Sequence, residues 1–270
     1  MAGVDWTDST VEAGGIKLHL KRAGPTAKKT RTIVVLHHET GTLDRLPFYD
    51  ALAAHYDVLV PHHPGYSRSE RPTWMRSVRD VAVVHRGLLS ELKIKDAALV
   101  GLGFGGWIAA EMASMAPADL SHLVLVGAMG IKPPQGDILD LAITGYVDYA
   151  RAGFHDQKAF DRVYGAEPSI DQLEMWDICR EMSFRIAWKP YMYSQTLPHL
   201  LGAVRAPALV VWGDDDRVVP QSAAARYIEA LPRAKLEIVK ASGHCVDMEQ
   251  PDALARLIVD FIGREWLPCT

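Results

Sequence analysis

The sequence lacks an apolar run long enough to cross a membrane, and it has no extended basic run of the kind that binds nucleic acid. The formal net charge is -4 at pH 7, and the clustered cations Lys28, Lys29 and Arg31 fall in an expected loop. We therefore expect neither nucleic acid nor a membrane as a partner. The first nine residues are acidic and polar where a signal peptide needs an apolar core, so the cytoplasm is the expected compartment.

Cysteine is also scarce. Cys179, Cys245 and Cys269 are odd in number and widely spaced, which fits a reducing compartment and gives no zinc-binding pattern. Cys245 follows a histidine of interest and is either a reactive thiol or, as we expect, a packing residue.

What the chain does contain is an alternation of apolar strand-like segments with amphipathic helical ones. At 270 residues and 49% hydrophobic composition it can form one sizeable core with an insertion. The strands are expected at 16–20, 32–36, 58–60, 97–100, 123–126, 208–212 and 236–239, and the helices at 47–54, 78–92, 108–115 and 251–262. This rhythm predicts an α/β fold with a mostly parallel sheet of about eight strands and helices on both faces.

The rhythm stops between about residues 130 and 201, where the chain is helical in propensity and rich in large aromatic side chains. We interpret 131–201 as a helical cap inserted after the sixth strand, with 1–130 and 202–270 forming the core. For most of these aromatics, simple packing between helices is the expected role, and the others would face a substrate.

The segment 99–107 has the shape of a nucleophile elbow, because a buried strand runs into a helix through a cluster of glycines. Such a turn strains the backbone of its central residue, which glycine tolerates. Gly103 stands where a serine, cysteine or aspartate is expected. The usual attacking oxygen or sulfur is therefore missing.

Acyl transfer on such a sheet needs an attacking group, a base, an acid that orients the base, and backbone N–H groups for the oxyanion. The candidates occur in the order elbow, acid, histidine, and four motifs follow one another over residues 15–265. In these features the chain resembles the α/β-hydrolase superfamily, especially its capped esterase, C–C hydrolase and lactonase branch.

The resemblance implies roles for individual residues. His244, in Ser-Gly-His, matches the general base rather than a histidine that is merely hydrogen-bonded in a loop, and Asp216 matches the acid that fixes the imidazole tautomer. The neighbouring Asp214 and Asp215 are expected to be solvated. Phe104 would supply one oxyanion N–H group.

The second oxyanion donor is expected at Glu39, where His38 replaces the glycine usual in the family. An ionised Glu39 pointing inward would oppose an oxyanion, whereas a protonated one with a raised pKa could donate a hydrogen or act as an acid. The alternative is that the side chain turns to solvent or to Arg68.

Four histidines at adjacent strand ends, His37, His38, His62 and His63, raise the question of a metal site. Neighbouring residues at a strand end point to opposite sides, so at most two of the four readily converge. We therefore expect no metal and no cofactor, and we expect His37 and His62 to tie loops together.

The substrate pocket should lie between the strand ends and the cap, with an apolar, partly aromatic lining. The expected lining residues are His38, Trp107, Met129, Trp176, Phe184, Trp188 and Tyr191. A small-molecule substrate is the expected partner of a monomer or homodimer.

A glycine elbow leaves three interpretations. The protein is an enzyme in which His244, oriented by Asp216, deprotonates the substrate or a water without a covalent intermediate. Alternatively it is an ordinary serine hydrolase with an inactivating glycine at position 103, or a ligand-binding protein without catalysis.

Overall fold

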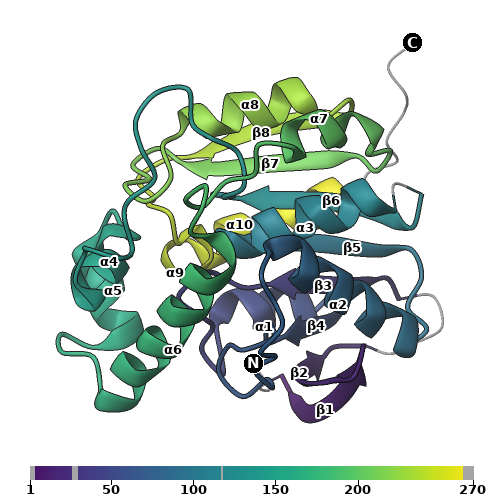
Figure 1. The fold of residues 1–270 in the computed structure, drawn as a ribbon, viewed down its shortest axis with the longest axis horizontal. Coiled ribbons are helices and arrows are strands. Elements are labelled where there is room, and N and C mark those ends of the chain that lie inside the picture. The colour runs from purple at the N-terminus through teal and green to yellow at the C-terminus, as the bar shows by residue number, and fades with distance from the viewer. Residues whose placement is uncertain (1–3, 26–29, 117, 264–270) are drawn as a thin grey trace.

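The computed structural model describes residues 4–25, 30–116 and 118–263, and its centre is a sheet of eight strands (Figure 1). The strands are β1 (Thr7–Ala13), β2 (Ile16–Ala23), β3 (Thr32–Leu36), β4 (Asp57–Pro61), β5 (Ala97–Leu102), β6 (Leu120–Val126), β7 (Ala208–Gly213) and β8 (Ala234–Val239). Their order across the sheet is β1-β2-β4-β3-β5-β6-β7-β8. The pairs β1–β2 and β2–β4 are antiparallel and the other neighbours are parallel, which confirms the prediction of a mostly parallel sheet.

Helices cover both faces of the sheet because the central strands are apolar on both sides. In β3, Ile33 and Val35 belong to one hydrophobic cluster, whereas Val34 and Leu36 belong to the other. The first cluster includes α1 (Pro47–Ala53), α9 (Val246–Glu249) and α10 (Pro251–Gly263). The second includes α2 (Val78–Glu91), α3 (Phe104–Met115) and α8 (Ser222–Ala230).

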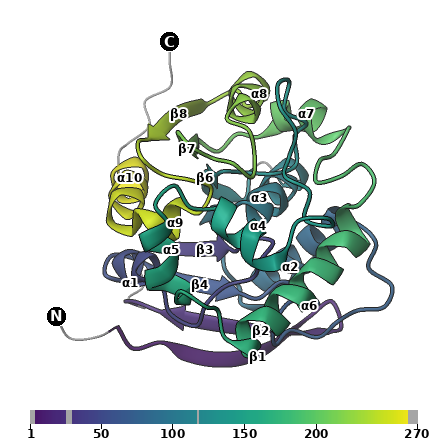
Figure 2. The ribbon, with the colours of Figure 1, turned by 90° about the vertical axis from the view of Figure 1, so that its left-hand side faces the viewer.

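A helical insertion occupies residues 127–207, between β6 and β7. It contains α4 (Tyr146–Ala152), α5 (Gln157–Tyr164), α6 (Ile170–Ala187), α7 (Leu197–Leu200) and the 3-10 helix η1 (Leu201–Ala203). Figure 2 shows α4, α5 and α6 lying in front of the sheet, at the end where the loops after the parallel strands emerge. The insertion therefore stands over the elbow that joins β5 to α3.

Two elements differ from the expectation. Strand β1 was not predicted, because its outward residues are polar and most of its side chains are exposed. Helix α3 begins at Phe104, four residues before the predicted start, so the glycine cluster belongs to its first turn. Within the described part of the chain, the helices are too short or too polar for any of them to cross a bilayer.

Candidate active site

The turn between β5 and α3 has the strained geometry that the sequence predicts. Gly103 adopts φ +52° and ψ -112°, in the region that favours glycine. Its N–H donates to the carbonyl of Val126 at 2.9 Å, which holds the turn against the next strand. Gly105 allows close packing, since a Cβ there would lie 2.1 Å from the carbonyl oxygen of Leu36.

Three polar atoms converge beside Gly103. A Cβ at this position would lie 2.6 Å from Nδ1 of His38, 2.8 Å from Oε2 of Glu39 and 2.8 Å from Nε2 of His244. The loops after β3 and β8 thus bring together three residues that the sequence analysis singled out. The space in which a side chain at position 103 would begin is bordered by these groups.

His244 is held by Asp216, from the loop after β7. Its Nδ1 lies 2.9 Å from Oδ2 of Asp216, and both side chains are at most 1% exposed. The other carboxylate oxygen, Oδ1, accepts from the backbone N–H groups of Val218 and Val219 at 2.9 and 2.8 Å. These bonds fix the carboxylate, and the carboxylate fixes the ring.

The charge state of His244 differs from the expected neutral base. Burial lowers the pKa of the imidazole, but the carboxylates of Asp216 and Glu39 outweigh burial and raise it to about 10. The two carboxylates therefore favour the protonated form of the ring. A protonated ring is a proton donor, and the general-base role of His244 stays a prediction.

Glu39 points into the site, so the expectation of a side chain turned to solvent or to Arg68 is wrong. It is 2% exposed, and Oε1 accepts from the hydroxyl of Tyr149 at 3.0 Å. Burial raises the pKa of Glu39, but His244, whose Nε2 lies 3.8 Å from Oε1, outweighs burial and lowers it to about 2. Glu39 is therefore ionised, not the protonated acid considered from the sequence.

The amide of Phe104, the expected oxyanion donor, faces this carboxylate. Its N–H donates to Oε2 of Glu39 at 3.4 Å. An oxyanion at this amide would therefore stand beside the ionised carboxylate, which opposes it.

His38 has a partner that the sequence analysis missed. Its Nε2 lies 2.8 Å from Oδ1 of Asp247, in α9, and the two side chains are 1% and 0% exposed. Asp247 follows His244 by three residues, but nothing in its local pattern separates it from a surface aspartate. The contact spans 209 residues and depends on the whole fold.

The other strand-end histidines form a separate structural group. The N–H of His63 donates to Nε2 of His37, and Nε2 of His63 lies 3.0 Å from the carbonyl of His37. Nδ1 of His63 lies 2.8 Å from Nε2 of His85. These bonds are satisfied by neutral rings, and they confirm that His37 ties loops together. For His62 this expectation is wrong, because within the described residues its ring nitrogens have no hydrogen-bond partner.

A small cavity of about 10 Å³, room for about one water molecule, adjoins Glu39 and His244. Its lining comes mainly from α4, the loop after it and α5, and consists of Glu39, Thr40, Tyr149, Ala150, Gly153, Phe154, Tyr164, Val218, His244 and Cys245. The volume is far below the roughly 300 to 1,000 Å³ typical of ligand pockets. Apart from the charged pair, the lining is largely apolar.

None of the aromatic residues or the methionine expected to line the pocket borders this cavity. Trp107, Met129 and Trp176 are buried, and Trp107 donates to Glu111 within α3. Trp188 is 55% exposed and forms an aromatic group with Phe184 and Tyr191. The spacing of these residues in the sequence does not indicate which helix faces point into the pocket. Substrate contact by these residues stays a prediction.

Cys245 is a buried free cysteine on the cavity wall, and Cys179 is also buried and free; Cys269 lies outside the described residues. Burial, together with the carboxylates around it, raises the pKa of the Cys245 thiol well above its ordinary value. A thiol that stays protonated is a poor nucleophile, which favours the packing role.

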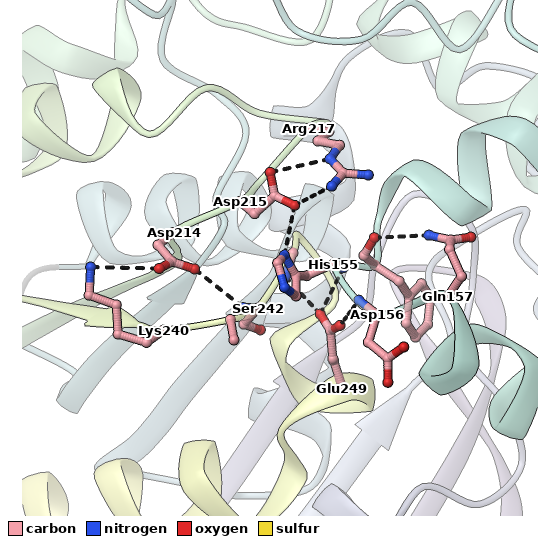
Figure 3. A network of polar contacts seen from close by, with 12 residues as sticks. His155, Asp156, Gln157, Asp214, Asp215, Arg217, Lys240, Ser242 and Glu249 are labelled. Atoms are coloured by element: carbon pink, nitrogen blue, oxygen red, sulfur yellow. Dashed lines mark hydrogen bonds and ion pairs between the residues drawn. The ribbon is translucent and has the colours of Figure 1, made fainter.

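A polar network beside the site joins the insertion to the loop that carries His244 (Figure 3). Glu249, in α9, accepts from the backbone N–H groups of Gly243, His155 and Asp156 at 2.7, 3.1 and 2.5 Å. The expected solvated aspartates lie at its edge, with Asp215 bonded to His155 and Arg217. One side chain therefore anchors two segments that meet at the site.

Known proteins with similar sequences and structures are hydrolases. A 2-hydroxy-6-oxononadienedioate/2-hydroxy-6-oxononatrienedioate hydrolase of Paraburkholderia phymatum is 28% identical over 270 residues, with 93% of each chain covered. A 2-hydroxymuconate semialdehyde hydrolase of Pseudomonas sp. (strain CF600) is 28% identical over 226 residues, with 78% of each chain covered.

The solved structure of a meta-cleavage product hydrolase from Pseudomonas fluorescens IP01 superimposes with a TM-score of 0.76 at 22% identity, covering 94% of this chain and 97% of that one. Residues 33–257 match the family described as the alpha/beta hydrolase family. With the sheet order, the elbow and the position of the histidine loop, this match shows that the chain belongs to the alpha/beta hydrolase family.

Proposed function

We propose that this protein hydrolyses a C–C or ester bond in a small, largely apolar carbonyl compound, and that water rather than a side chain attacks the carbonyl carbon. The relatives named as hydrolases of ring-fission products support this class of reaction. The observation that carries the proposal is the convergence of His38, Glu39 and His244 at Gly103, where a hydrolase with a covalent intermediate needs its nucleophile.

The site contains one base and one acid. Glu39 is ionised and can accept a proton from the attacking water, while His244, held by Asp216, carries a proton that it can donate. In the proposed step the water oxygen bonds to the carbonyl carbon, the scissile bond breaks, and His244 protonates the departing group. General acid and base catalysis of this kind contributes about 10²- to 10⁴-fold each.

In this proposal the helical insertion serves as a cap. Tyr149, Phe154 and Tyr164 bring apolar surface to the cavity beside Glu39 and His244, which favours an apolar substrate group at this point. The cavity of about 10 Å³ has room for a water and none for an acyl group, so the proposal requires the lining to move apart when the substrate binds.

The contacts of Gly103 weigh against the second interpretation, an ordinary serine hydrolase with an inactivating glycine. A serine here would place its Cβ less than 3 Å from three side chains, including an imidazole and a carboxylate fixed by buried partners. Restoring a serine would therefore require the site to rearrange.

The test is a turnover assay with 2-hydroxymuconate semialdehyde and with short p-nitrophenyl esters. We expect turnover by the wild-type chain without a pre-steady-state burst, and incorporation of one ¹⁸O atom from labelled water into the acid product of a single turnover. His244→Ala should abolish the activity, whereas the control His155→Ala, at a surface histidine paired with an aspartate, should retain it.

Two outcomes contradict the proposal. Turnover with a burst by Gly103→Ser, together with an inactive wild-type chain, would establish the serine hydrolase interpretation. Tight binding of the same compounds without turnover by either form would establish the ligand-binding interpretation.

A further inference from the structure

Two buried ring nitrogens in the site have no hydrogen-bond partner within the described residues. They are Nδ1 of His38 and Nε2 of His244, and both rings are 1% exposed. Each points at the same place, since both lie within 2.8 Å of the Cβ position of residue 103. A buried ring nitrogen without a hydrogen-bond partner is costly whether or not it carries a proton, so this arrangement calls for a ligand.

A carboxylate completes the set. One ligand atom each from His38, Glu39 and His244 lies within 4.8 Å of the other two. Two imidazole nitrogens and one carboxylate oxygen form a known donor set for zinc and for other divalent transition metals.

We propose that His38, Glu39 and His244 bind one divalent first-row transition-metal ion, with Zn²⁺ as the reference case. A tetrahedral ion with bonds of about 2.0 to 2.1 Å separates its ligand atoms by roughly 3.4 Å. Nε2 of His244 and Oε1 of Glu39 are already 3.8 Å apart. Small side-chain movements therefore suffice to bring the three donors onto one ion.

The surroundings of both imidazoles match those of metal-binding histidines. Such residues usually give their second ring nitrogen to a carboxylate, which fixes the tautomer and strengthens the ligand. Asp247 has this relationship to His38, and Asp216 has it to His244. By contrast, both ring nitrogens of His63 form hydrogen bonds, so neither is available to bind a metal ion.

The charge balance points the same way. The carboxylates of Glu39, Asp216 and Asp247 are all buried, at 2% exposure or less. Their hydrogen bonds and ion pairs join them to histidines, to the Tyr149 hydroxyl and to backbone amides. Buried carboxylates are stable only when compensated, and a dication at the centre of this group supplies the missing positive charge.

This inference revises the expectation that the chain binds no metal. That expectation considered only the four strand-end histidines, of which His37 and His63 stack together while His38 turns to Asp247. The set His38, Glu39 and His244 was not considered, because His244 lies 206 residues after His38 and only the fold brings them together.

The inference rests on the proposed function in one respect, that water is the nucleophile. A bound divalent ion lowers the pKa of a coordinated water toward about 7 and polarises a carbonyl oxygen. Binding would displace the Nε2 proton of His244, and the ion would take over the activation of the water from the acid and base pair.

The experiment uses the full chain, treated with a chelator and then dialysed. Titration calorimetry with Zn²⁺ should show one ion per chain with a Kd of about 1 μM or lower. Titration with Co²⁺ should give visible absorption bands typical of mixed nitrogen and oxygen ligation in a site of low coordination number, and both ions should raise the melting temperature.

The variants distinguish the residues proposed to bind the ion from the aspartate that orients one of them. His38→Asn and Glu39→Gln should each weaken Zn²⁺ binding at least about 100-fold, and Asp247→Asn, which leaves the ligands in place, should weaken it about 10- to 100-fold. The matched control is His155→Ala, which removes a surface histidine that is also paired with an aspartate. Its Kd should stay within about twofold of wild type. Circular dichroism spectra establish that each variant is folded.

The inference is overturned if the folded wild-type chain takes up neither ion at about 100 μM, or if His38→Asn and Glu39→Gln bind like wild type. Its failure is distinguishable from failure of the proposed function. Turnover that survives removal of metal leaves the hydrolase proposal standing and removes the metal from it. Zn²⁺ bound by these ligands without any turnover leaves the metal site standing and contradicts the hydrolase proposal.

Discussion

The Nε2 atom of His38 lies 2.8 Å from Oδ1 of Asp247, and this pair repeats, beside Gly103, the relationship between His244 and Asp216. Both aspartate side chains are fully buried. Each carboxylate fixes the outer nitrogen of its ring, so the inner nitrogens of both rings are directed at Gly103. The site is therefore built from two oriented imidazoles rather than one.

Asp216→Asn should reverse the tautomer of His244. The amide oxygen of the new residue would accept from the N–H groups of Val218 and Val219, as Oδ1 of Asp216 does, and its NH₂ group would then face Nδ1 of His244. Nδ1 would have to accept, which leaves the proton on Nε2 and loses the stabilising charge. We expect kcat/KM to fall by about 10²- to 10⁴-fold.

The control for this variant is Asp215→Asn, one residue earlier, which alters a half-exposed carboxylate paired with Arg217 and His155. Its kcat/KM should remain within about threefold of wild type, since exposed ion pairs contribute little. Equal losses in the two variants would show that the loop as a whole, and not the orientation of His244, is responsible.

Gly103→Ala should destabilise the protein although it adds a single methyl group. The backbone at φ +52° disfavours a Cβ, and that Cβ would lie 2.6 to 2.8 Å from His38, Glu39 and His244. We expect the free energy of unfolding to fall by about 1 to 4 kcal/mol, measured by urea denaturation.

Gly202→Ala is the comparison for this measurement, because nothing lies within 4 Å of the Cβ position in η1 and the φ angle is not in the left-handed region. It should be neutral or stabilising by up to about 1 kcal/mol. A Gly103→Ala protein as stable as wild type would mean that the cluster around position 103 is loose, contrary to the close contacts described above.

Tyr149→Phe should weaken the attachment of the insertion to the site. The hydroxyl of Tyr149 donates to the buried carboxylate of Glu39 at 3.0 Å, and its removal leaves Oε1 of Glu39 without this donor. The expected loss in the free energy of unfolding is about 1 to 3 kcal/mol. Tyr146→Phe, on the same helix, removes a bond to the exposed Asp177 and should cost less than about 0.5 kcal/mol.

Stability should decrease as the pH falls below about 6.5, in part because of His63 and His85. Burial, reinforced by neighbouring histidines, lowers the pKa of His63 well below its ordinary value and that of His85 to about 3. In the unfolded chain both bind protons near pH 6.5, so below that pH the unfolded state holds more protons and is favoured. The loss continues until the folded pKa is reached.

His85→Gln isolates one of these contributions. The slope of unfolding free energy against pH, measured between pH 6.5 and pH 4.5, should decrease by up to about 1.4 kcal/mol per pH unit. His199→Gln, at an exposed position, should leave the slope unchanged. A slope that is the same in His85→Gln and wild type would mean that His85 is protonated in the folded protein.

The sheet and the elbow could be predicted because their signal is local. Buried parallel strands read as short apolar runs, and the glycines around Gly103 mark a turn with close backbone contacts. The pairing of Asp216 with His244 followed from the family resemblance, and the structure places the two side chains 2.9 Å apart.

The remainder of the site depends on contacts between distant parts of the chain. The inward direction of Glu39 is set by Tyr149, 110 residues later, and the partner of His38 is 209 residues away. A carboxylate in a polar loop reads as a solvated residue unless its surroundings are known. In the insertion, helical spacing identified the aromatic residues but not the faces that they occupy, so Trp188 was expected inside and lies at the surface.

The hydrogen bonds of Glu249 link the helical insertion to the loop that carries His244. The carboxylate of Glu249 accepts hydrogen bonds from the backbone N–H group of Gly243, just before His244, and from those of His155 and Asp156, just after α4. Because one carboxylate holds both segments, a displacement of α4 would also strain the loop that carries His244.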